Sequence, residues 1–230
     1  MNQLKTTGIV LSRTNYGEAD RILTMLTPDY GKLRAIARGV RREKSKLAGG
    51  IELFSISQIS LIRGRGELNT LISTRLIKHY GNIVKDLGRT MLAYELIKQL
   101  NRVTEDEPEP EYFELLQNTF SALDDPTIDT NLIKVWFAMQ LLRLGGHTPN
   151  IQTDVAGNKL VLDDIYNFDF ESMSFVSMPN GRFTANHIKL LRLGFGPYQP
   201  KVLQQVGGID SLLIDVIPLV QTMLKTHIRL

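Results

Sequence analysis

Short apolar runs that alternate with polar residues occupy the first third of the chain, and glycine and turn residues separate them. Alternation with a period of two is typical of a β-strand that buries one face. No helical period appears among these runs. The pattern predicts five strands, at Thr7–Ser12, Asp20–Thr27, Lys32–Arg38, Ile51–Ile62 and Leu68–Lys78.

Two connections between these strands have the composition of tight turns. Residues Pro28 to Gly31 join the second and third strands, since proline fixes φ and glycine accepts a positive φ. The loop Arg63–Glu67 joins the fourth and fifth strands and contains two glycines. Five strands in about 75 residues predict an OB-fold β-barrel, and an SH3-like barrel is the alternative.

The period becomes helical after about Asp86. Leu92, Leu96 and Leu100 recur at four-residue spacing and predict an amphipathic helix that ends at the acidic connector 105–110. A second apolar stripe runs through 113–123. The run 132–142 is apolar on nearly every side, which is typical of a helix in the middle of a bundle.

Residues 147–183 return to short alternating runs with aromatic residues, and these runs predict β-hairpins. Helix is expected again at 184–193 and from Ile209 onward, with a kink or interruption at Pro218. We therefore expect an α+β multidomain protein: an OB-fold domain at 1–80, then an α-helical domain at 81–230 with a β-hairpin excursion at 147–183.

Positive charge is concentrated in the predicted barrel. The chain of 230 residues has a net charge of +3, but residues 1–80 contain 14 Lys/Arg and 6 Asp/Glu, whereas residues 81–150 contain 6 and 11. Cysteine is absent, so disulfides, thiolate zinc sites and cysteine nucleophiles are excluded. Neither a membrane-spanning run nor a signal peptide is recognisable, which predicts a cytoplasmic protein.

A dense run of cations follows the third predicted strand. Several Lys/Arg on one surface suit a polyphosphate backbone, because each phosphate contact releases counterions. The same run is also compatible with an ordinary solvated face. The candidate DNA-binding residues are Lys32, Arg34, Arg38, Arg41, Arg42, Lys44 and Lys46, with Arg63 and Arg65 in the second hairpin.

Two tyrosines lie in turns beside this run. Tyr16 and Tyr30 are candidates for stacking on bases, although a turn tyrosine is more often a structural plug.

Enzyme signatures are missing from the sequence. It contains no phosphate-binding P-loop, no HExxH zinc motif and no GxSxG elbow, and its four histidines are dispersed without metal-ligand spacing. We expect no catalytic residue, no metal and no cofactor. Besides DNA binding, two functions stay open: an interaction adapter whose basic barrel binds acidic partners, and an RNA-binding OB module.

Several short segments together resemble the bacterial RecO family of DNA repair proteins. Each segment alone is a weak signal, but their order and spacing are specific. They are YGEADRIL at 16–23, LTPDYGKL at 26–33, ARGVR at 37–41, KSKL at 44–47, IELF at 51–54 and GRGEL at 64–68, with a fainter echo in LLRLGGHTP at 141–149.

The resemblance implies an OB-fold that binds single- and double-stranded DNA and a helical domain beside it. It also implies a recombination mediator without catalytic chemistry, which anneals complementary strands and helps to load RecA on strands coated by single-stranded DNA-binding protein. The implied partners are RecR and the acidic tail of single-stranded DNA-binding protein.

The chain departs from the family at Arg75, where an acidic residue is expected near the end of the last strand, and, more importantly, in its lack of cysteine. Many family members have four cysteines in a zinc-finger-like insertion, and this chain has none. The insertion is expected at 150–183, where Tyr166, Phe168 and Phe170 would have to hold the hairpins without metal.

Overall fold

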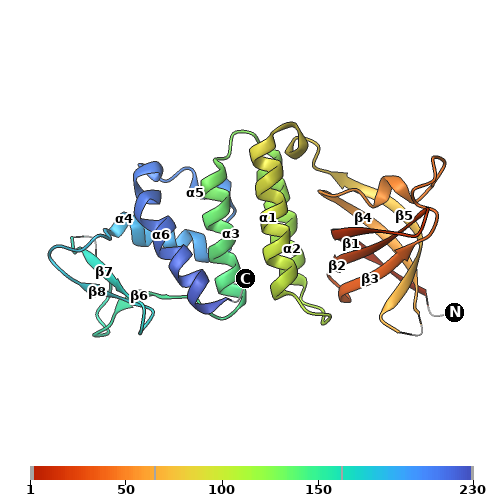
Figure 1. The fold of residues 1–230 in the computed structure, drawn as a ribbon. Coiled ribbons are helices and arrows are strands. Elements are labelled where there is room, and N and C mark those ends of the chain that lie inside the picture. Colours follow the sequence, from red (N-terminus) through yellow and green to blue (C-terminus); the bar gives the residue numbers. More distant parts are fainter. Residues whose placement is uncertain (1–2, 65, 162, 229–230) are drawn as a thin grey trace. The chain divides into compact units, whose positions relative to one another are not determined.

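A computed structural model describes residues 3–64, 66–161 and 163–228. The contacts between residues divide the chain into two compact units, Met1–Asp124 and Asp125–Leu230. Figure 1 labels their helices and strands. The first unit therefore includes two helices in addition to the strands, while the division into domains at residue 80 stays a prediction.

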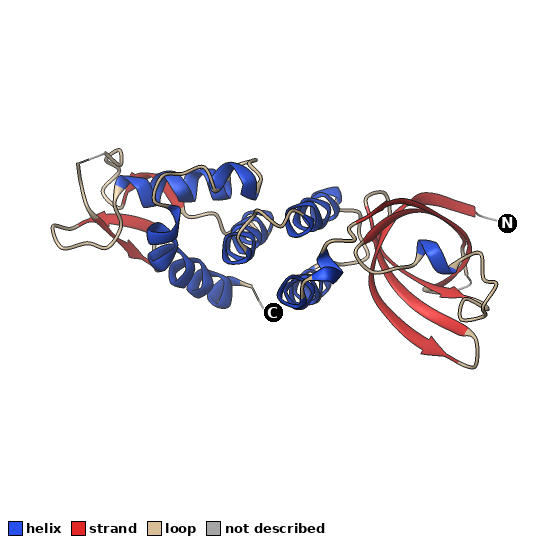
Figure 2. Ribbon diagram, turned by 90° about the horizontal axis from the view of Figure 1, so that it is seen from above, coloured by secondary structure: helices blue, strands red, loops and turns tan. Residues whose placement is uncertain are grey.

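The first unit contains a five-stranded closed barrel with the neighbour order β1-β2-β3-β5-β4. All neighbouring strands are antiparallel except β3 and β5, which pair in parallel through Arg34–Ile36 and Leu68–Thr70. This Greek-key closure confirms the OB-fold expectation, and Figure 2 shows the strands wrapped around a common interior. The bounds are β1 Gln3–Tyr16, β2 Asp20–Thr27, β3 Gly31–Ala37, β4 Ser55–Ile62 and β5 Leu68–His79.

Strand β1 is longer than its apolar pattern predicts because it closes the barrel. Its first half, Gln3–Ile9, pairs with β4, and its second half pairs with β2. The register shifts between Val10 and Ser12, and such a bulge lets one strand bend between two partners. Strand β4 starts at Ser55 and not at Ile51, because residues 51–54, after a 3-10 turn at Ala48–Gly50 (η1), form a bend and a turn in which Phe54 has a positive φ of 56°.

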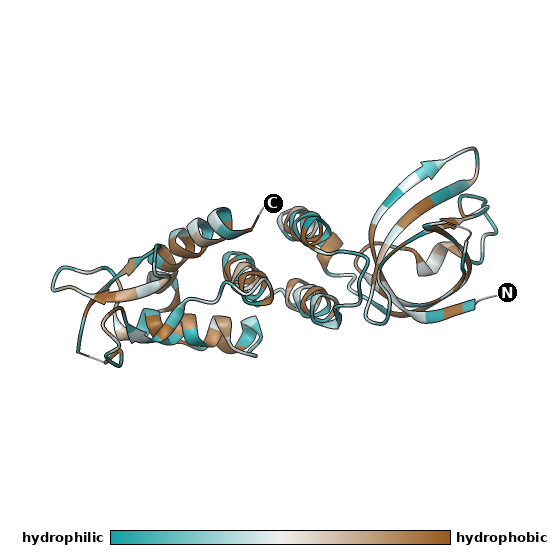
Figure 3. Ribbon diagram, turned by 90° about the horizontal axis from the view of Figure 1, so that it is seen from below, coloured by the Kyte–Doolittle hydropathy of each residue, from teal (hydrophilic) through white to brown (hydrophobic). Residues whose placement is uncertain are grey.

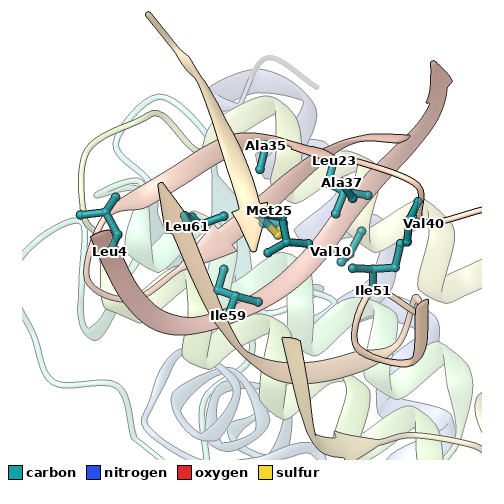
Figure 4. Packing of buried hydrophobic residues seen from close by; sticks show 11 residues of the cluster. Leu4, Val10, Leu23, Met25, Ala35, Ala37, Val40, Ile51, Ile59 and Leu61 are labelled. Carbon is teal, nitrogen blue, oxygen red and sulfur yellow. The ribbon is translucent and has the colours of Figure 1, made fainter. Parts of the chain in front are cut away.

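The interior of the barrel is filled by the inward members of each alternating strand. Hydrophobic and hydrophilic positions alternate along the barrel strands in Figure 3, as a half-buried strand requires. Figure 4 shows the packed side chains, which come from all five strands and from the loop after β3: Leu4, Val10, Leu23, Met25, Ala35, Ala37, Val40, Ile51, Ile59, Leu61 and Leu71.

Two helices complete the first unit, α1 at Leu87–Val103 and α2 at Pro110–Asp124, after a 3-10 turn (η2) at Ile83–Lys85. The carboxylate of Asp86 caps α1 by accepting a hydrogen bond from the amide of Arg89 at 2.8 Å. Aromatic rings join the helices to the barrel. The Phe54 ring, just before β4, lies edge-on to Tyr94 of α1 at 5.3 Å and to Phe120 of α2 at 5.7 Å.

The second unit is a helical bundle with a small sheet. Helix α3 is buried along nearly its whole surface, as its apolar sequence predicts. Helix α6 continues past Pro218, so of the two expected effects of this proline, a kink or an interruption, the interruption does not occur. The short helix α5 was not predicted. The bounds are α3 Thr130–Leu144, β6 Asn150–Asp154, β7 Tyr166–Asp169, β8 Ser174–Ser177, α4 Ala185–Phe195, α5 Pro200–Leu203 and α6 Ile209–His227.

The small sheet has the order β6-β8-β7. Strands β7 and β8 form the predicted hairpin, but β6 joins them in parallel. The Phe175 ring lies edge-on to Tyr166, Phe168 and Phe183, with centroids 5.1 to 6.3 Å apart. Aromatic packing therefore supports these strands, as the sequence predicts.

Candidate nucleic-acid interface

Strand β3 presents cations on its outer side. Ala35 and Ala37 are fully buried in the barrel, whereas Arg34 and Arg38 are exposed. This is the alternation that the sequence predicts, because successive side chains of a strand point to opposite faces. Arg34 lies 3.9 Å from the carboxylate of Glu67, and both side chains are more than half exposed, so this ion pair contributes little.

The loop after β3 continues this row of cations and is attached to the β1–β2 turn. The amide of Arg41 donates to the carbonyl of Ala19 at 2.9 Å, and the Arg41 guanidinium donates to the carbonyl of Gly17 at 3.3 Å. The amide of Gly39 donates to the Asp20 carboxylate at 2.7 Å. These bonds hold the loop while its charged side chains stay in solvent.

We call the six exposed cations of β3 and this loop the cationic surface. Among the described residues, only Arg34 of this set has an ion-pair partner. Cations without an internal ion pair can attract phosphates without first breaking such a pair. The members are Arg34, Arg38, Arg41, Arg42, Lys44 and Lys46.

A pocket lies between the β4–β5 hairpin and the first residues of β3. The pocket has a volume of about 290 Å³, and Arg34 and Arg63 line it together with the acidic residues Glu67 and Asp106. Arg63 is exposed, as predicted. Arg65 lies outside the described residues.

Lys32 differs from the other predicted DNA contacts. Its ammonium donates to the carbonyl of Thr104 at 2.7 Å and to that of Asn101 at 3.1 Å, at the C-terminal end of α1. Its amide also donates to the carbonyl of Glu105 at 3.2 Å. Cations are favourable at a helix C-terminus, where carbonyls lack amide partners. Lys32 therefore joins the barrel to α1, and its half-buried ammonium is bonded to the end of that helix.

The two candidate stacking residues have different surroundings. Tyr16 ends β1, is 56% exposed and lies opposite Asp20 in the β1–β2 register. Tyr30 packs against the hydrophobic core of the barrel, and its amide donates to the hydroxyl of Thr27 at 3.1 Å. Tyr16 is therefore accessible to a base, whereas Tyr30 acts as a structural plug.

Two further arginines lie on the barrel strands beside these residues. Arg21 of β2 is half-buried, one position from the end of the strand, and its guanidinium donates to the side chain of Asn15 at 3.1 Å. Nothing in the sequence singles out Arg21, because a single cation at the start of a strand resembles ordinary surface. Arg13 is paired with Glu52 at 3.0 Å.

The described residues contain neither a cluster of three potential metal ligands nor a helix long and apolar enough to cross a membrane.

Comparisons with known proteins identify the family. The family described as "Recombination protein O N terminal" matches residues 1–80, which end with the barrel, and "Recombination protein O C terminal" matches residues 85–197. A DNA repair protein RecO of Dehalococcoides mccartyi is 32% identical over 199 residues, covering 83% of this chain and 78% of the relative. The RecO of Acetivibrio thermocellus is 33% identical over 177 residues, covering 76% and 70%. The chain belongs to the RecO family of DNA repair proteins.

Proposed function

We propose that this protein is a non-enzymatic recombination mediator. It binds single- and double-stranded DNA through the cationic surface, anneals complementary strands and helps to load RecA on strands coated by single-stranded DNA-binding protein. The observation that carries the proposal is the row of six exposed cations on one strand and one loop of an OB barrel. Membership of a DNA repair family supports it.

Annealing follows from this kind of contact. Each strand of DNA repels its complement through its phosphates, and cations that neutralise some of these phosphates lower that repulsion. Contacts to the backbone do not depend on base sequence, so bound strands can slide until their bases find register. The exposed ring of Tyr16, beside the loop that Arg41 contacts, adds a surface on which a base can stack.

The proposal includes two protein partners. RecR is one, and the acidic tail of single-stranded DNA-binding protein is the other, with the helical part of the chain recruiting the tail. Binding DNA and recruiting the acidic tail both need only non-covalent contacts. The proposed mediator is therefore not an enzyme.

The test is DNA binding as a function of salt. If the six cations each contact one phosphate, the slope of log affinity against log salt for single-stranded DNA is about −4, a loss of about 300-fold between about 50 and about 200 mM salt. The double variant Arg41→Glu, Arg42→Glu leaves four contacts, and the loss falls to about 50-fold. Anisotropy of a labelled oligonucleotide measures both curves.

A second charge reversal serves as the matched control. Lys189→Glu with Lys225→Glu changes the net charge by the same amount, at exposed helical positions of the other unit. The control should keep the wild-type slope. Equal losses in both double variants would mean that net charge alone attracts DNA, and would reject the cationic surface as the site. An RNA competitor that displaces DNA at equal concentration would favour the RNA-binding alternative.

A further inference from the structure

A second pocket lies in the unit 125–230, far along the sequence from the cationic surface. It has a volume of about 400 Å³ and opens between strand β7, the segment before α4 and the middle of α6. Its apolar lining comes from Phe168, Phe170, Phe183 and Leu219. The Phe170 ring packs edge-on against Phe168 at 5.0 Å and is still 40% exposed, so an aromatic surface is open to a guest.

The polar group at this pocket is the carboxylate of Asp215 on α6. Its two oxygens lie 3.6 Å from the Arg182 guanidinium and 3.7 Å from Nε2 of His187. His187 is only 7% exposed, and its Nε2 has no hydrogen-bond partner. Burial lowers the pKa of His187, so the ring is neutral near pH 7. Among the described residues, Arg182 alone, whose side chain is 75% exposed, offsets the Asp215 charge.

The acidic side chain in the pocket is a hydrogen-bond acceptor. Pro218 also lines the pocket and has no amide hydrogen, so it cannot act as a backbone donor there. The Asp215 carboxylate therefore favours a guest that brings a hydrogen-bond donor.

The segment beside the pocket is strongly acidic. Residues 163–171 contain four acids and no cation, and two of these acids, Asp169 and Glu171, flank Phe170. Hydrogen bonds from the Ser172 hydroxyl and from neighbouring amides lower the pKa of Asp169, which keeps its carboxylate ionised. Nucleic acid is repelled by such a rim, whereas a cationic segment is attracted to it.

We propose that this pocket docks a basic segment of a partner protein, with one apolar or aromatic side chain as the anchor. The anchor would fill the space between Phe168, Phe170 and Phe183, as buried aromatic contacts do at the centre of protein interfaces. A lysine or arginine next to the anchor would pair with Asp215 or lie over the exposed Phe170 ring. This docking site goes beyond the mediator function and does not depend on it.

The test uses three labelled peptides with the full-length protein. One alternates lysine and phenylalanine, one alternates lysine and serine, and one alternates glutamate and phenylalanine. The lysine–phenylalanine peptide should bind most tightly, and anisotropy should show its affinity falling roughly five- to tenfold in Phe170→Ala, because about 1 kcal/mol of aromatic contact is lost. In Asp215→Asn its affinity should fall and depend less on salt.

The matched control is Val155→Ala, which trims an apolar residue of similar exposure beside the same small sheet but outside the pocket. It should leave peptide affinity unchanged, and fluorescence of Trp136 under urea should show that every variant is folded. The proposal is overturned if the lysine–phenylalanine peptide does not bind, or binds equally to wild type and Phe170→Ala. An acidic peptide or an oligonucleotide whose binding falls in Phe170→Ala would also overturn it, and would assign the pocket to that ligand.

Discussion

Replacing Lys32 by methionine separates a structural cation from a DNA-binding one. Methionine retains an unbranched apolar stem of similar length but removes the ammonium that donates to the carbonyls of Asn101 and Thr104. The backbone bond from the Lys32 amide to Glu105 is kept, so the path of the chain stays the same. The variant therefore removes one interaction between β3 and the end of α1.

The expected cost follows from that interaction. Hydrogen bonds from a charged donor contribute more than neutral ones, and a cation at a helix C-terminus adds a smaller favourable term. For a half-buried side chain with two such bonds we expect a loss of about 2 kcal/mol. A loss of this size makes the opening of the end of α1 about thirtyfold more frequent.

Hydrogen exchange measured on peptides that span 100–107 reports this opening directly. Lys44→Met is the matched control, since Lys44 is exposed and has no ion pair among the described residues. The free energy of unfolding of the Lys44→Met variant should change by less than about 0.5 kcal/mol, while the affinity of this variant for DNA falls. Fluorescence of Trp136, the single tryptophan, reports the other unit and should shift in neither variant.

The opposite pattern would refute this reasoning. If Lys32→Met leaves exchange at the end of α1 unchanged but weakens DNA binding as much as Lys44→Met does, the ammonium belongs to the DNA-binding surface and not to the helix end.

Two further predictions concern backbone conformation and pH. Gly31→Ala should destabilise the first unit by at least about 3 kcal/mol, because φ is +61° and the new Cβ would overlap a carbonyl of the α1–α2 connector. The control Gly17→Ala, where φ is +56° and the space around the new Cβ is open, should destabilise it by only about 1 kcal/mol. A urea titration followed by circular dichroism measures both changes. The stability of the second unit, followed by Trp136 fluorescence, should fall as pH decreases below about 6.5, because the lowered pKa of buried His187 makes the unfolded chain bind more protons. His187→Gln should reduce that pH dependence. If the stability of this variant depends on pH as that of the wild type does, His187 is not the cause of the dependence.

The elements of this protein were predictable where one local pattern decides them. Strand β2 begins and ends where its alternation predicts, and Asp86 caps α1 at the point where the period becomes helical. The parallel pairing of β6 was not predictable, since its partner β8 lies about twenty residues away and alternation does not reveal which strands pair. The sequence left open whether Pro218 kinks or interrupts α6, and the helix continues because packing against α3 and α4 outweighs the loss of one hydrogen bond.

In the candidate site too, some features follow from the local sequence pattern and others from tertiary contacts. Alternation along β3 determined that Arg34 and Arg38 face away from Ala35 and Ala37, because the period of a strand is a local property of the backbone. Composition likewise determined that the barrel, and not the helices, has the excess of positive charge.

Only the tertiary structure decided which cations are available. Lys32 lies in the same basic run as Arg34, yet its ammonium is bonded to carbonyls about seventy residues later in the chain. Tyr30 is partly buried against the core, while Tyr16 is open to solvent. The pocket at Asp215 joins β7, the segment before α4 and α6, which no spacing in the sequence connects. A side chain's partners depend on which distant segments the fold brings beside it, and the local pattern of residues does not predict those segments.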